Sequence, residues 1–182
     1  MIPRPKALST QGSLRSEFGT RQRGSALVEF AIVVTVLLTV MLGVIDFSRA
    51  IYTYHWVAEA AREATRYASV RGSACNTWGS ACPAVATDVT SYVQTIVSSG
   101  IYVSSTVTGS PSSTTAGALG VTTTWPGTGG SGGTCRTGTQ PVNYPGCVVT
   151  VRVQYTYGFS LPYLSSLSKM NFSSTSQVVI SQ

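Results

Sequence analysis

The sequence predicts an α+β protein, in which a long amino-terminal transmembrane helix continues into a folded domain with a second helix and a small antiparallel sheet. Three observations lead to this fold class. Residues 25–45 form an apolar run, and residues 47–68 repeat apolar and small side chains at helical spacing. Residues 147–159 alternate valine with polar residues, which is typical of a strand with one buried face.

The amino-terminal residues 1–24 carry most of the positive charge. The chain has 182 residues and a net charge of +6, of which five basic residues and Glu17 place +4 in this segment. A basic tail also occurs in nucleic-acid-binding proteins. Its position directly before an apolar run instead predicts a cytoplasmic leader without regular structure, and no nucleic-acid partner is expected.

The apolar run is long enough to cross a membrane. Residues 25–45 contain one charge, Glu29, and at about 1.5 Å per residue they span the hydrocarbon core of about 30 Å. Asp46 and Arg49 mark its end. An aromatic belt at the interface is expected next, formed by Tyr52, Tyr54 and Trp56. No small-residue cleavage site of a secretory signal peptide follows the run, because "MLGVID" does not fit that pattern.

The helix is expected to continue beyond the membrane to about Val70, so that residues 25–72 form one transmembrane and amphipathic helix. Its charged face holds Glu59, Arg62, Glu63 and Arg66. The opposite, apolar stripe is predicted to hold Phe47, Ala50, Tyr54, Val57, Ala61, Ala64 and Ala68. The alanines in this stripe allow another layer to approach closely.

Residues 73–182 are predicted to form a separate α+β domain. A second helix of about 15 residues begins near Pro83, and a turn or short helix is expected at 161–170. The apolar face of the helix that begins near Pro83 is predicted to comprise Val85, Val89, Tyr92, Val93 and Ile96. Strands are expected at 101–108, 121–125, 147–159 and 172–181, with a Gly-rich loop at 126–146.

The four cysteines all follow the apolar run and favour disulfides. Their spacings, C-x6-C and C-x11-C, do not fit the usual zinc-binding patterns. Three connectivities are open. We favour the local pairing, Cys75 with Cys82 and Cys135 with Cys147, because each pair brackets a turn-rich loop.

No catalytic or metal-binding set is recognisable, so neither an enzyme nor a cofactor is expected. The stretch "GGSGG" around Ser131 satisfies G-x-S-x-G, but no helix pattern follows it. His55 is the only histidine and lies beside the apolar run. Glu59, Glu63 and Asp88 are candidates for an acid–base set, but neighbouring arginines favour a solvated, salt-bridged helix face for the two glutamates.

The segment from Arg23 to Gly72 resembles the TadE/TadG-like minor pseudopilins of tight-adherence (Flp-type) type IV pilus systems. The features that carry the resemblance are an Arg-Gly pair, a Glu-Phe pair that opens a long apolar helix, and an Ala/Arg-rich continuation. They comprise Arg23-Gly24, Val28-Glu29-Phe30, Gly43, Asp46-Phe47, Arg49 and the run Ala60–Arg66 leading to Tyr67-Ala68. Thr35 departs from the proline that is expected at this place in many relatives, and the length of the chain suits the TadE type.

The resemblance implies a structural subunit with a pilin-like periplasmic domain, acting in pilus biogenesis, adhesion or secretion. A prepilin peptidase would cut between Gly24 and Ser25, and Glu29 and Phe30 would belong to the processing signal. The chain would cross the bacterial inner membrane once, contact its lipids, and place residues 73–182 in the periplasm. The implied partners are other pilin or pseudopilin subunits and the inner-membrane assembly platform.

Two points stay open at this stage. The sequence does not decide whether the protein enters the filament or remains in the membrane, nor which pilus it serves. The alternative function is that of an unprocessed single-pass membrane protein with an extracytoplasmic binding domain.

Overall fold

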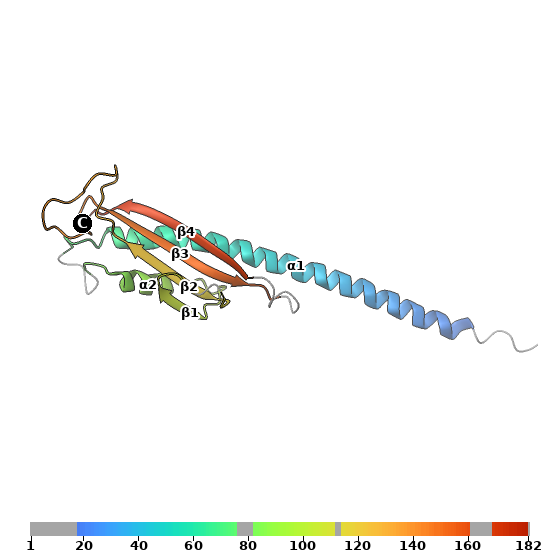
Figure 1. Ribbon diagram of the computed structural model, residues 1–182. Helices are drawn as coiled ribbons and strands as arrows, with labels where there is room; N and C mark the ends of the chain where they lie inside the picture. Colours follow the sequence, from blue (N-terminus) through green and yellow to red (C-terminus); the bar gives the residue numbers. More distant parts are fainter. Residues whose placement is uncertain (1–17, 76–81, 112–113, 161–168, 182) are drawn as a thin grey trace, which may run out of the picture. The chain divides into compact units, whose positions relative to one another are not determined.

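The computed structural model describes residues 18–75, 82–111, 114–160 and 169–181. The elements follow in the order α1 (Phe18–Ser69), α2 (Ala86–Thr95), β1 (Ser105–Thr108), β2 (Ala118–Thr124), β3 (Val148–Gly158) and β4 (Lys169–Val179) (Figure 1). The α+β fold class is therefore confirmed. The chain divides into two compact units, residues 1–43 and residues 44–182.

Helix α1 is continuous through both the apolar run and the amphipathic stretch, and no proline interrupts it. Several of its hydroxyl side chains are satisfied within the helix. The hydroxyls of Thr35, Thr39 and Ser48 each donate to the carbonyl four residues earlier, at 2.7–2.8 Å. Such bonds let polar residues occur in an apolar helix without an unpaired group. The helix ends at Ser69, close to the predicted end at Val70.

In the second unit, α1 buries a stripe of small side chains, but the stripe begins at a different residue from the predicted one. Ala50, Val57, Ala61, Ala64 and Ala68 are buried as expected. The predictions for Phe47 and Tyr54 were wrong, because their side chains are 66% and 55% exposed. The buried stripe starts instead at Asp46 and passes through Ala50 and Thr53, since Asp46 is held by the end of β3.

Trp56 also differs from the expectation of an interfacial aromatic belt. Its side chain is buried, and the indole N–H donates to the carbonyl oxygen of Ile96 at 3.2 Å. The ring packs edge-on against Tyr155, with a centroid distance of 6.3 Å. Trp56 therefore belongs to the core of the folded unit, whereas Tyr52 and Tyr54 are exposed.

The sheet has four strands in the order β1-β2-β3-β4. The pairs β2–β3 and β3–β4 are antiparallel, but β1 and β2 are parallel, so the sheet is mixed rather than wholly antiparallel. After β1, the chain turns back across the sheet over Gly120. A Cβ atom at Gly120 would lie 2.2 Å from Pro111 Cδ, so only glycine leaves room for this return. The chain thus enters β2 in the same direction as β1.

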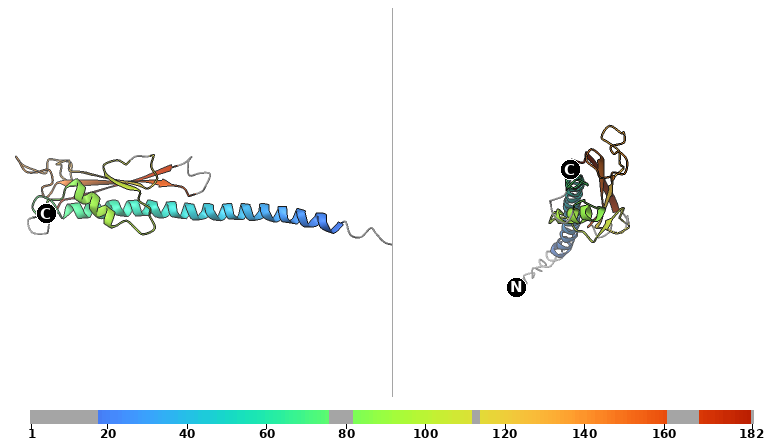
Figure 2. Two further views of the ribbon diagram at one scale, coloured as in Figure 1. Left: turned by 90° about the horizontal axis from the view of Figure 1, so that it is seen from below. Right: turned by 90° about the vertical axis from the view of Figure 1, so that its left-hand side faces the viewer.

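Both views in Figure 2 place α2 and the carboxyl-terminal half of α1 on the same face of the sheet. The side chains of Val149, Val151 and Val153 point to this face and are fully buried, as the alternating pattern predicted. From α2, Val89 and Val93 complete the core. The layers are therefore joined mainly by valine and alanine.

Two elements are shorter than predicted. Helix α2 has 10 residues rather than about 15, because neither the chain from Pro83 to Val85 nor the chain after Thr95 is helical. The Val85 N–H donates to the Asp88 carboxylate at 3.1 Å, which fixes the start of the helix, and the Val85 side chain is exposed. Strand β1 begins at Ser105 rather than at residue 101. Most of the turn or short helix expected at 161–170 lies outside the described residues.

The two disulfides join Cys75 to Cys82 and Cys135 to Cys147, the local pairing that the spacing favoured. The second one fixes the Gly-rich loop at the start of β3. Backbone bonds anchor the same loop, from Val148 N–H to the Thr128 carbonyl at 2.8 Å and from Gly146 N–H to the Ile180 carbonyl at 2.9 Å. The stretch around Ser131 forms turns between isolated bridges.

Candidate functional site

The amino-terminal part of α1 presents apolar side chains in every direction. Between Leu27 and Ile45 the large apolar residues are exposed, with the single exception of the partly exposed Val34. The helix from Gly24 to Ser69 is long and apolar enough to cross a membrane, and its most apolar stretch is wholly unburied. Exposed apolar surface on this scale fits contact with lipid rather than with water. Among its described residues, the chain therefore has one helix that is suited to anchor it in a membrane.

The four predicted processing residues lie together at the beginning of this apolar part. Gly24, Ser25, Glu29 and Phe30 are all within α1, and all are exposed. Ser25 and Glu29 are four residues apart, which places them on the same face of the helix. Among the described residues, none forms a hydrogen bond or an ion pair with the Glu29 carboxylate.

The structure does not bring Glu59, Glu63 and Asp88 together as an acid–base set. Glu59 pairs with Arg62 on the exposed face of α1, with 3.5 Å between carboxylate and guanidinium. Glu63 accepts a hydrogen bond from the Tyr92 hydroxyl at 3.1 Å. Partial burial, and then this bond to a carboxylate, raise the pKa of Tyr92 above 10. With Asp88 capping α2, each carboxylate has a separate structural role.

His55 is exposed, and its ring packs edge-on against Tyr54 at a centroid distance of 5.8 Å. In the part of the chain that the structure describes, no group of three or more His, Cys, Asp or Glu side chains is placed to hold a metal ion. His55 is therefore a surface side chain of α1.

Asp46 is a structural anchor that the sequence indicated only as the end of the apolar run. It is 4% exposed, and its Oδ2 accepts a hydrogen bond from the Ser160 N–H at 2.9 Å. The Tyr157 hydroxyl donates to the backbone oxygen of Asp46 at 3.1 Å. Burial, followed by the negative charge of Asp46, raises the pKa of the Tyr157 hydroxyl. These bonds tie the end of β3 to α1, across more than 110 residues of sequence.

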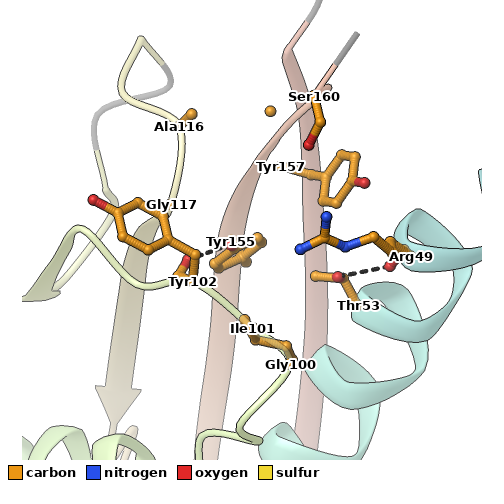
Figure 3. A pocket seen from close by; sticks show the side chains of 11 residues that line it. Arg49, Thr53, Gly100, Ile101, Tyr102, Ala116, Gly117, Tyr155, Tyr157 and Ser160 are labelled. Atoms are coloured by element: carbon orange, nitrogen blue, oxygen red, sulfur yellow. Dashed lines mark hydrogen bonds between the residues drawn. The ribbon is translucent and has the colours of Figure 1, made fainter. Parts of the chain in front are cut away.

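A cavity of about 230 Å³ lies beside this anchor, between α1, the segment around Ile101 and the end of β3 (Figure 3). The Arg49 side chain extends from α1 toward Tyr157, and Thr53 lies one turn further along the helix. On the opposite wall the Tyr155 hydroxyl donates to the carbonyl oxygen of Tyr102. The lining residues are Arg49, Thr53, Gly100, Ile101, Tyr102, Ala116, Gly117, Tyr155, Tyr157, Gly158 and Ser160.

Sequence reasoning missed this cavity because its lining comes from three distant segments. Arg49 was identified only as a charge after the apolar run, and Tyr155 and Tyr157 only as part of a strand. The alternation along β3 does indicate that both tyrosines face the core side, but it cannot place them opposite Arg49.

Comparison with known proteins identifies one segment of the chain. No curated protein and no solved structure matches the chain. Residues 24–66, all within α1, match the family model described as TadE-like protein, and the resemblance of this segment to TadE-like proteins is thereby confirmed.

Proposed function

We propose that this protein is a TadE-like minor pseudopilin, a non-catalytic structural or assembly subunit of a tight-adherence pilus system. It is processed by a prepilin peptidase and acts with other pilin or pseudopilin subunits and the inner-membrane assembly platform. Its amino-terminal leader faces the cytoplasm, and the unit formed by residues 44–182 lies in the periplasm. The two disulfides favour such an oxidising compartment.

The observation that carries this proposal is the position of the family match. It begins at Gly24, the residue before the expected cut, and covers the exposed apolar part of α1, with Glu29 five residues after Gly24. A membrane anchor alone does not require a carboxylate there. An acidic residue costs roughly 2.5–3.5 kcal/mol at the centre of a span, and less near the end of a span, where Glu29 lies.

Cleavage at Gly24 requires the start of α1 to open. The Gly24–Ser25 bond lies inside the helix in the uncut chain, so its carbonyl is engaged in helical hydrogen bonding rather than extended in a protease site. Glycine is about 1 kcal/mol less favourable than alanine inside a helix, which eases local unwinding at this residue. A Cβ at Gly24 would meet nothing within 4 Å, so packing among the described residues does not explain the glycine.

Cutting after Gly24 would create a charged partner for Glu29. The new amino terminus at Ser25 is positively charged at neutral pH, with an ordinary pKa of about 7.7–8.0. When helices leave the bilayer and pack together, the ammonium group and the Glu29 carboxylate can neutralise one another, within one subunit or between two. A buried pair of this kind fixes register more than it adds stability, but breaking it costs about 3–5 kcal/mol.

Glu29→Ala is therefore expected to abolish or strongly reduce pilus assembly. The experiment is a count of pili per cell in a strain that carries the complete pilus system, with immunoblotting to show that the variant reaches the membrane. Val33→Ala is the matched control, because Val33 lies one turn further on the same exposed face of α1. Normal numbers of pili with Glu29→Ala, or equal loss with Val33→Ala, would count against the pairing.

A further inference from the structure

Arg49 lines the cavity described above, and its side chain carries a full positive charge into it. Within the described ranges, no carboxylate lies within ion-pairing distance of its guanidinium, and nothing accepts a hydrogen bond from it. The guanidinium has five N–H donors in a planar fork, which matches the oxygens of a phosphate or carboxylate.

The remaining polar groups of the cavity also suit an anion. The Tyr155 and Tyr157 hydroxyls are already used as donors, to Tyr102 and Asp46. No acidic side chain belongs to the lining, whereas the Ser160 side chain projects into it beside Tyr157. The cavity thus offers one cation and a hydroxyl.

The depth of the cavity along α1 matches that of lipid phosphates. Arg49 is four residues after Ile45, the end of the apolar run, which corresponds to about 6 Å of helix. The headgroup region on each side of a bilayer is about 5–8 Å thick. Tyr52 and Tyr102 are exposed near this level, the latter by 72%, and amphipathic rings are favoured there.

We propose that Arg49 and its cavity bind the phosphate of an anionic phospholipid headgroup on the side of the membrane where the folded unit lies. A headgroup with neutral hydroxyls, such as that of phosphatidylglycerol, can bond to Ser160 while its phosphate meets Arg49. A choline headgroup is disfavoured, because its cation would face the guanidinium. This site depends on α1 crossing the membrane but not on cleavage after Gly24, so either proposal can fail without the other.

The test measures phospholipid retention by the full-length chain. The protein is reconstituted in nanodiscs of phosphatidylcholine mixed with phosphatidylglycerol, released into a neutral detergent, and examined by native mass spectrometry for bound lipid. Arg49→Gln is expected to lower phosphatidylglycerol binding about fivefold, the loss expected for one cation near an anionic membrane surface. Because the Arg49 side chain is exposed, the variant should keep its thermal unfolding midpoint.

Lys169→Gln is the matched control. Lys169 pairs with Gly158 across β3 and β4, next to the cavity, but does not line it. The site proposal predicts wild-type lipid binding for this variant, whereas an equal loss would indicate diffuse attraction and overturn the proposal. Unchanged binding by Arg49→Gln would also overturn it, as would displacement of the lipid by equimolar inorganic phosphate. If Arg49→Gln lost self-association in the same mass spectra but kept its bound lipid, the proposal would be overturned and Arg49 would be assigned to a protein contact.

Discussion

Removing the disulfide between Cys135 and Cys147 lowers the free energy of unfolding of the folded unit by about 3 kcal/mol, the loss expected for a closed loop of this size. The bond closes a segment with a sequence separation of 12. Cys147 is fully buried in the core cluster, directly before β3, so its replacement also disturbs packing. The expected consequence is a folded unit that is still formed but markedly less stable.

The measurement is urea denaturation of the full chain in detergent, followed by tryptophan fluorescence, since Trp56 lies in the core. The double variant Cys135→Ala/Cys147→Ala is compared with Cys75→Ala/Cys82→Ala. The second pair has a sequence separation of 7, for which the chain-entropy model gives about 2.4 kcal/mol. A larger loss from the Cys75–Cys82 pair would contradict this ranking.

Ala64→Leu is expected to destabilise the folded unit by about 1–3 kcal/mol, the usual result of inserting methylenes into a packed core. Ala64 is completely buried on α1, in the same cluster as Ala61 and the valines of β3. A leucine at this position would force the helix and the sheet apart or adopt an unfavourable rotamer. The alanine stripe thus sets how closely α1 approaches the sheet.

The same denaturation experiment tests this second prediction. Glu59→Leu is the control, because Glu59 lies on the exposed face of α1 and its ion pair with Arg62 is solvated. That variant should remain within about 0.5 kcal/mol of the wild type. An equally small effect of Ala64→Leu would contradict the conclusion that the alanine stripe sets how closely α1 approaches the sheet.

The elements with a long regular pattern could be predicted from the sequence. The end of α1 near Val70 and the strand at Val148–Gly158 follow from periodicities that extend over many residues. The local cysteine pairing also agrees with the structure, because each pair brackets turn-forming residues. In these cases the information lies within a short stretch of chain.

Features that depend on distant partners could not be predicted. Asp46 and Trp56 both looked like interfacial residues after an apolar run, but their partners, Ser160 and Ile96, lie far along the chain. The parallel pairing of β1 with β2 depends on the close passage of the chain over Gly120, which hydrophobic alternation does not encode. The cavity at Arg49 could not be predicted either, because its lining residues come from distant segments of the chain.

The processing residues stay predictions. Gly24, Ser25 and Glu29 lie on a helix that matches the TadE-like model, but among the described residues of the uncut chain none pairs with the Glu29 carboxylate. Their roles depend on a reaction between this chain and a peptidase.

The most direct test of the account is the mass of the protein extracted from membranes of cells with and without the prepilin peptidase. The chain is expected to lose residues 1–24 and begin at Ser25 when the peptidase is present, and to keep its full length when the peptidase is absent. An intact amino terminus in the presence of an active peptidase would contradict the account and favour an unprocessed membrane protein with an extracytoplasmic binding domain.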